Sequence, residues 1–153
     1  MSLIFGQPLD GVEYSERRAA YVVILNGEGR VAMVNDNDKW YLPGGGTEGS
    51  ETPEETARRE VCEELARNVR LTRVLGRAVQ YYYSSADERH YRMEAAFFSG
   101  ELTDEPVGGT PEHELRWVTV DEAQRECFHA CHAWIITQAL TNRSEPPAVA
   151  GGF

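Results

Sequence analysis

Short apolar runs bounded by polar segments dominate the pattern of this chain. The strongest run, residues 19–25, is rich in β-branched and aromatic side chains and has the length of a buried strand. Residues 26–29 (Asn-Gly-Glu-Gly) have the composition of a hairpin turn, so residues 30–34 are predicted to form the returning strand. Further segments with strand-like composition are residues 68–74, 77–83, 90–98 and 115–118.

A helix is predicted to begin at Pro53. Thr52-Pro53-Glu54-Glu55 has the form of a capping box with proline at the first helical position. We expect this helix to run to about Ala66 or Asn68. This helix start follows shortly after the glycine-rich segment Pro43-Gly44-Gly45-Gly46, where unusual backbone angles are expected.

The second helical pattern covers residues 121–140, with a break expected near Phe128. Residues 103–114, rich in Gly, Pro and Glu, are predicted to form a loop before it. Strands, a helix, more strands and a final helix predict an α/β fold, a mixed β-sheet with flanking helices. The 153 residues fit one domain, which we expect to span residues 1–143, with residues 144–153 as a flexible C-terminal tail.

Charge and composition restrict the classes of molecule that this protein is expected to bind. The 15 Lys and Arg residues against 25 Asp and Glu give a net charge of −10, which repels nucleic acid polymers. The longest apolar run is too short to cross a bilayer, and no signal-peptide pattern is visible. Three cysteines, an odd count, indicate reduced thiols and a cytoplasmic location. We expect neither a membrane nor a nucleic-acid partner; a small phosphorylated ligand bound through divalent cations fits, and a homodimer is left open.

Three carboxylates share one face of the first predicted helix. Glu60, Glu63 and Glu64 stand at i, i+3 and i+4, where like charges repel unless a cation collects them. An apolar stripe lies beside them on the same helix, formed by Ala57, Val61 and Leu65. Clustered oxygen ligands suit hard cations such as Mg²⁺ or Mn²⁺, although such a cluster is more often a solvated helix face.

The spacing around these carboxylates distinguishes the two interpretations. From Gly45 through Glu51 and Arg59 to Glu64 the chain has the form G-x5-E-x7-R-E-V-x-E-E, which arises by chance on the order of once in ten million positions. This pattern, with Leu42-Pro43-Gly44-Gly45 before it, resembles the box of the Nudix hydrolase family. The family's final glycine is replaced by Ala66, so we expect the helix to continue past this residue and Asn68 or a neighbour to provide the left-handed cap.

The resemblance implies a Nudix-type α/β/α sandwich and a divalent-metal site, with Mg²⁺ or Mn²⁺ as the cofactor. The metal ligands that it implies are Gly44 (through its carbonyl), Glu60, Glu63, Glu64 and, from a later loop, Glu112. The catalytic residues that it implies are Glu51, Arg59, Glu60 and Glu63. Glu51 would bind a cation through water or hold Arg59, and Arg59 would orient carboxylates. The general base is left open between Glu60 and a loop acid such as Glu112.

The implied reaction is hydrolysis of a nucleoside diphosphate linked to another group. Trp40 and Tyr83 are candidate substrate-binding residues; a tyrosine near position 83 resembles a marker of dinucleoside polyphosphate hydrolases, and the proline typical of ADP-ribose hydrolases is absent. A nucleoside triphosphate or dinucleoside polyphosphate is therefore favoured. ADP-ribose or nucleotide-sugar hydrolysis is the alternative within the enzyme class. A non-catalytic nucleotide sensor and an interaction domain with a merely soluble acidic face are alternatives from other classes.

A second cluster, Cys127, His129, Cys131 and His132, has the form C-x-H-x-C-H and invites a zinc interpretation. His129 points away from the helical face that the two cysteines share, and no second pair of ligands completes the set. We therefore favour packing in the last helix, since free cysteines are among the most buried residues.

Overall fold

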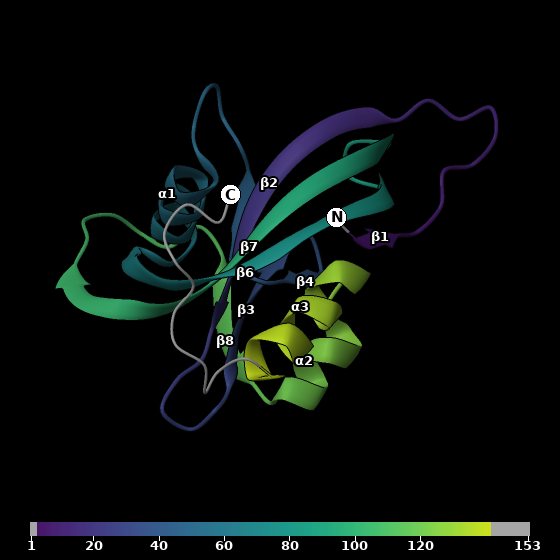
Figure 1. The fold of residues 1–153 in the computed structure, drawn as a ribbon. Coiled ribbons are helices and arrows are strands. Elements are labelled where there is room, and N and C mark those ends of the chain that lie inside the picture. Colours follow the sequence, from purple (N-terminus) through teal and green to yellow (C-terminus); the bar gives the residue numbers. More distant parts are fainter. Residues whose placement is uncertain (1–2, 142–153) are drawn as a thin grey trace.

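Strand β2 (Ser15–Ile24) contains the apolar run predicted at residues 19–25 and contributes side chains to both hydrophobic clusters of the fold. The computed structural model describes residues 3–141, and in it the six residues from Ala19 to Ile24 are all buried. A strand that is apolar on both faces has to be covered from both sides. Figure 1 shows α1 (Pro53–Leu65) on one side of the strands, and α2 (Val120–Glu126) and α3 (Ala130–Thr141) on the other.

The strands form two sheets. The larger sheet contains, in spatial order, β1 (Leu3–Phe5), β6 (Arg67–Ser84), β7 (Arg89–Pro106), β2 and β5 (Gly44–Gly46). The smaller sheet contains β4 (Lys39–Tyr41), β3 (Val31–Asp36) and β8 (Glu114–Val118). The larger sheet is mixed, because β1 runs parallel to β6 and β2 parallel to β7, whereas β6 and β7 are antiparallel. The predicted mixed sheet with flanking helices is therefore confirmed.

Alternate side chains of β2 supply two separate hydrophobic clusters. Tyr21 and Val23 pack in the cluster that includes the buried face of α3. Val22 and Ile24 pack in the other cluster, together with the predicted apolar stripe of α1. The stripe is formed by Ala57, Val61 and Leu65, of which the first two are completely buried. Because this stripe is buried against the sheet, the orientation of α1 is fixed. The acidic face of the helix therefore lies beside the sheet edge.

Several predicted strand boundaries change in the structure. The segments predicted at residues 68–74 and 77–83 belong to one strand, β6. Its register against β7 shifts between residues 67 and 69, 71 and 73, and 74 and 76. Gly76, at φ 147°, lies at one of these irregularities, where a bulge lets a long strand bend. Strand β7 continues into the predicted loop 103–114, and β1 was not predicted. The predicted break near Phe128 is confirmed, because α2 ends at Glu126 and α3 begins at Ala130.

The end of α1 differs from the prediction. The helix begins at Pro53 with a complete capping box, as expected, but it ends at Leu65. Ala66 itself is the left-handed cap (φ 52°, ψ 38°), and its N–H donates to the carbonyl of Cys62 at 2.9 Å. The prediction that the helix continues past Ala66 and is capped at Asn68 or a neighbour is wrong, because β6 starts at Arg67 and the chain must reverse before it. Alanine adopts this conformation at a cost of roughly 1 kcal/mol relative to glycine.

Within residues 3–141, no helix is long and apolar enough to cross a membrane. The end of the predicted domain, residues 142–143, and the predicted flexible tail, residues 144–153, lie outside the described residues.

Candidate active site

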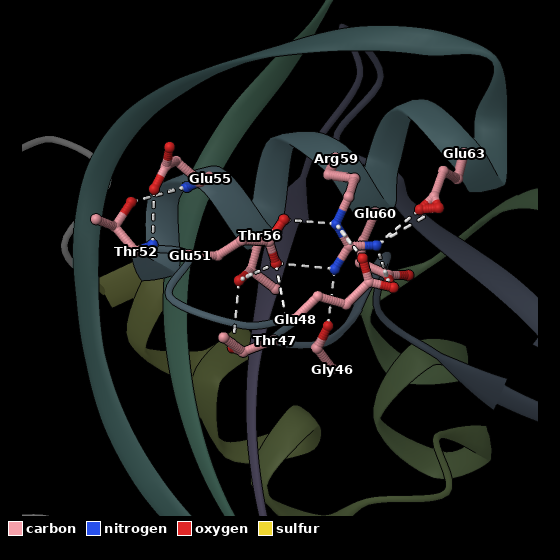
Figure 2. A network of polar contacts seen from close by, with 10 residues as sticks. All are labelled: Gly46, Thr47, Glu48, Glu51, Thr52, Glu55, Thr56, Arg59, Glu60 and Glu63. Carbon is pink, nitrogen blue, oxygen red and sulfur yellow. Dashed lines mark hydrogen bonds and ion pairs between the residues drawn. The ribbon is translucent and has the colours of Figure 1, made fainter.

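The guanidinium of Arg59 is the centre of the acidic face of α1 (Figure 2). Its Nε donates to Glu51 Oε2 at 2.6 Å and its Nη2 donates to the Gly46 carbonyl at 2.8 Å. Its Nη1 donates to Glu60 Oε1 at 2.9 Å and to Glu63 Oε1 at 2.7 Å. One cation therefore holds three of the predicted site carboxylates, and it also ties α1 to β5.

Glu51 is fixed from several directions in the loop before α1. Besides Arg59, its Oε1 accepts hydrogen bonds from the Thr56 hydroxyl at 3.0 Å and from the Glu48 N–H at 2.9 Å. Hydrogen bonding to Arg59 is the main cause that lowers the pKa of Glu51 to about 2. Glu51 is thus ionised and orients Arg59, which is one of the two roles that the sequence left open for it.

Glu64 lies apart from this network and is buried. Its side chain is 8% exposed, Oε1 accepts the N–H of Gly44 at 2.8 Å, and the imidazole of His113 places Nε2 3.8 Å from Oε2. Burial, with a smaller contribution from the negative charge of Glu60, raises the pKa of Glu64 to about 9. Burial also raises the pKa of Glu60. A charged carboxylate in this position would be stabilised by a nearby cation, and no lysine or arginine among the described residues is paired with it.

Glycine is required in this segment for two reasons: neighbouring atoms lie too close for a side chain, and one residue has backbone angles that favour glycine. A side chain at Gly45 would place its Cβ 2.5 Å from Glu60 Oε2. Gly44 has φ 146°, and a Cβ there would overlap the backbone of β2 at Ala20 and Tyr21. The two glycines therefore let β5 approach both β2 and the carboxylates of α1.

The loop before β8 brings Glu112 to the end of α1. The N–H groups of Glu112 and His113 donate to the last carbonyls of the helix, those of Glu63 (3.2 Å) and Glu64 (3.3 Å). These bonds satisfy acceptors that a helix end otherwise leaves unpaired. The charge of Glu112 contributes to the raised pKa of Glu64, so the predicted loop acid faces the predicted metal ligands.

The donor set fits a hard cation. Glu60, Glu63 and Glu64, together with Glu112 and the Gly44 carbonyl, offer only oxygen, the donor that Mg²⁺ and Mn²⁺ prefer. In the described part of the chain no three such side chains already converge on one point, because Glu60 and Glu63 are turned onto Arg59. The buried carboxylate of Glu64 has no such partner. The residues present therefore suit a divalent ion that would replace Arg59 as the partner of Glu60 and Glu63.

A cavity of about 350 Å³ opens beside Glu64 and Gly44. Its aromatic lining residues are Tyr21, Tyr41, Tyr82, Phe128 and His129, and its charged ones are Arg17, Asp36, Lys39, Glu64 and Asp87. The ring of His129 lies 4.5 Å from that of Tyr82 and 5.5 Å from that of Tyr41, centroid to centroid. Aromatic surface next to an acidic face is the composition expected for a nucleotide site.

The two predicted substrate-binding residues lie outside this lining. Trp40 packs under the guanidinium of Arg116, which is 5.1 Å from its ring centroid, and Tyr83 is 46% exposed beside His90. Their neighbours Tyr41 and Tyr82 line the cavity instead, because successive side chains of a strand point to opposite faces. The tyrosine-rich segment was the available signal; which of its residues faces the cavity depends on the sheet.

The Cys and His cluster belongs to the core of the α3 side. Cys131 and His132 are completely buried, and His132 Nδ1 accepts the N–H of Leu42 at 3.2 Å. Burial lowers the pKa of His129 to about 3 and that of His132 well below its ordinary value, so both rings are neutral. The burial of Cys131 and His132 in this core is the packing that the sequence favoured for them.

Fold and site together define a class of protein. A mixed sheet between helices, with a glycine-rich strand facing an R-E-x-x-E-E helix, is the arrangement of Nudix hydrolases. The NUDIX domain model matches residues 15–138, and this chain belongs to the Nudix hydrolase family.

Comparison with known proteins gives relatives of moderate similarity. A Bacillus subtilis (strain 168) protein named "Putative 8-oxo-dGTP diphosphatase" is 32% identical over 106 residues, 67% of this chain and 66% of that protein. A Mycobacterium tuberculosis (strain CDC 1551 / Oshkosh) protein, "Putative 8-oxo-dGTP diphosphatase 3", is 36% identical over 94 residues, 61% of this chain and 43% of that protein. This chain thus matches less than two thirds of the length of either relative. The crystal structure of the MutT protein from Methanosarcina mazei Go1 has a TM-score of 0.63 at 22% identity, covering 88% of this chain and 99% of that one, and it supports the fold.

Proposed function

We propose that this chain is a divalent-metal-dependent pyrophosphohydrolase. Its substrate is a nucleoside diphosphate linked to another group, with a nucleoside triphosphate or dinucleoside polyphosphate preferred. The observation that carries the proposal is the position of Glu64: a buried carboxylate among other carboxylates, at the wall of a cavity with aromatic lining. An acidic face that merely kept the protein soluble would not be buried at a cavity wall.

Each predicted metal-binding or catalytic residue has a role in this proposal. Glu60, Glu63, Glu64 and Glu112, with the Gly44 carbonyl, hold Mg²⁺ or Mn²⁺. The bound metal neutralises phosphate charge and lowers the pKa of the attacking water. Arg59 keeps Glu60 and Glu63 in place before metal binds, and Glu51 keeps Arg59 in place.

The general base remains open between two carboxylates. Glu60 is favoured by its pKa, which burial raises, because a base near the working pH accepts a proton better than a strongly acidic group does. Glu112 is favoured by its position on a loop that faces the end of α1. Rate against pH for the Glu60→Gln and Glu112→Gln variants separates them when Mg²⁺ is saturating at every pH. Metal affinity then no longer shapes the profile, and loss of the base removes its acidic limb.

The cavity supports a nucleotide substrate. Tyr41, Tyr82 and Phe128 provide aromatic surface against which a base can stack. Two curated relatives are named as 8-oxo-dGTP diphosphatases, which favours a purine nucleoside triphosphate. The cytoplasm, where such nucleotides occur, also fits the three cysteines, none of which forms a disulfide.

The test is a product-release assay with saturating MgCl₂. The panel comprises NTPs, dNTPs and 8-oxo-dGTP, dinucleoside polyphosphates, nucleotide sugars and ADP-ribose. We expect triphosphates or dinucleoside polyphosphates to give the highest kcat/KM, and the Glu63→Gln variant serves as the metal-site control. A highest kcat/KM for ADP-ribose would contradict the preferred substrate class. Nucleotide binding without turnover of any panel member would instead favour the sensor.

A further inference from the structure

Arg17, on β2, is a partly buried cation at the wall of the cavity. Its Nη1 donates to the hydroxyl of Tyr82 at 3.2 Å, and its guanidinium carbon lies 6.0 Å from the centroid of the Tyr91 ring. The backbone of Gly46 covers another side, since a Cβ added there would lie 3.4 Å from Nε and Nη2. These contacts fix the guanidinium in place while using one of its five N–H donors.

Within residues 3–141, Arg17 forms no ion pair with a carboxylate. Arg59, Arg70 and Arg92 each have one or more carboxylate partners at normal ion-pair distances. Arg17 influences Glu60 through space, where its charge acts to lower the pKa of that carboxyl, but the two side chains are not paired. A cation removed from water without a counter-ion is costly, and in proteins such a group is normally paired or awaits an anion.

The position of Arg17 indicates which anion this is. The cavity wall to which it belongs includes Gly44 and Glu64 of the metal face and Tyr82 of the aromatic lining. A nucleotide whose base stacks on the aromatic side and whose phosphates reach the metal face must pass Arg17. Guanidinium also presents a planar fork of donors that matches two phosphate oxygens.

We propose that Arg17 binds the phosphate chain of the substrate between the metal face and the aromatic lining. This inference rests on the proposed nucleotide pyrophosphohydrolase function and adds a binding residue to it. It also accounts for Tyr82, whose hydroxyl holds the guanidinium while its ring lines the cavity. Arg17 is not part of the sequence motif that identified the acidic helix, since it lies 28 positions before Gly45.

Arg18 offers a matched control on the same strand. It carries the same charge one position further along β2, so its side chain points to the opposite face of the sheet. It is exposed and lines a different cavity, with Arg77 and Arg92. A general effect of net charge on anion binding changes Arg17 and Arg18 variants equally, whereas a phosphate contact changes only one.

The experiment is calorimetric titration of the full chain with inorganic pyrophosphate, in MgCl₂ and again in EDTA, for the parent, Arg17→Met and Arg18→Met. We expect Arg17→Met to weaken pyrophosphate affinity about tenfold or more and Arg18→Met to stay within about twofold. The thermal midpoint of metal-free Arg17→Met should not fall, because an unpaired, partly buried charge is removed. Arg17→Gln, which keeps a donor for Tyr82, undergoes the same measurement and decides the matter where Arg17→Met does not fold.

Three results would overturn the inference. Parent-like pyrophosphate affinity in a folded Arg17 variant would show that the side chain does not contact phosphate. A lower thermal midpoint with unchanged affinity would assign Arg17 a structural role under Tyr82 and Tyr91. Equal losses for the Arg17 and Arg18 variants would indicate general attraction by positive charge. Equilibrium binding needs no turnover, so failure of the proposed hydrolysis and failure of this inference are separately visible.

Discussion

Replacing Glu64 with glutamine should stabilise the metal-free protein, and the gain should grow with pH. The glutamine oxygen can still accept the Gly44 N–H, and the volume of the side chain is almost unchanged. What disappears is the ionisable group in a site where burial disfavours the charge and where Glu60, Asp36 and Glu112 add negative potential. Among the described residues, no lysine or arginine forms an ion pair with Glu64, and the imidazole of His113 lies 3.8 Å away.

The sign and size follow from the pKa of Glu64, which is raised from 4.5 to about 9 in the folded state. Between these values the native state holds a proton that the unfolded state has released, so the free energy of unfolding falls as pH rises. The loss is about 1.4 kcal/mol per pH unit, or at most about 4 kcal/mol from pH 5 to pH 8. Glutamine escapes this loss. The variant and the parent should therefore be close at pH 5 and differ clearly at pH 8.

The assay is thermal unfolding in EDTA across this pH range. For a chain of this size 1 kcal/mol corresponds to about 2–4 °C in Tm, so the advantage of Glu64→Gln should widen by about 5 °C or more between pH 5 and pH 8. Glu126→Gln, at the exposed end of α2, controls for the loss of one surface charge. With saturating Mg²⁺ the order should reverse, because the parent gains binding energy that the variant has lost. A Tm difference that is independent of pH in EDTA would refute the reasoning.

Three further perturbations test other parts of the structure. Ala66→Gly should raise the free energy of unfolding by about 1 kcal/mol in denaturant titrations, because glycine adopts φ 52° without strain, and a loss of stability would contradict the left-handed cap. Glu63→Gln should lower kcat with saturating Mg²⁺ by roughly 100-fold, whereas parent-like turnover would remove Glu63 from the metal site. Tyr82→Leu should raise KM about tenfold and Tyr83→Leu should leave it unchanged, since only Tyr82 lines the cavity; equal effects would contradict this lining.

Local signals made α1 predictable almost to the residue. The capping box and the proline fixed its start at Pro53, and its apolar stripe identified the buried face. The end of the helix was predicted wrongly, because the left-handed conformation of Ala66 depends on the start of β6 at Arg67, which the local sequence does not indicate. The division of β6 into two predicted segments has a similar origin, because the bulge near Gly76 keeps one strand paired with β7 where composition indicates a gap.

The site divides in the same way between local and tertiary information. Spacing along one helix was enough to group Glu60, Glu63 and Glu64, and the spacing of the motif added Glu51 and Arg59. Burial is not encoded in spacing, so the sequence treats Glu63 and Glu64 as equivalent. The structure separates them: Glu63 is paired with Arg59 and Glu64 is enclosed against Gly44. For the same reason the sequence could not choose Tyr82 over Tyr83, or Arg17 over Arg18.

The distribution of charge explains how one acidic helix can be stable both with and without a metal. Arg59 neutralises part of the charge of Glu51, Glu60 and Glu63, and so limits their repulsion in the metal-free protein. Glu64 is not paired with Arg59, and because burial raises its pKa to about 9 it holds a proton at neutral pH. A divalent ion bound by these carboxylates, as we propose, would displace that proton and compete with Arg59 for Glu60 and Glu63. Metal affinity should therefore rise with pH, and Mg²⁺ titrations at pH 6 and pH 8 should show release of a proton that is absent in Glu64→Gln.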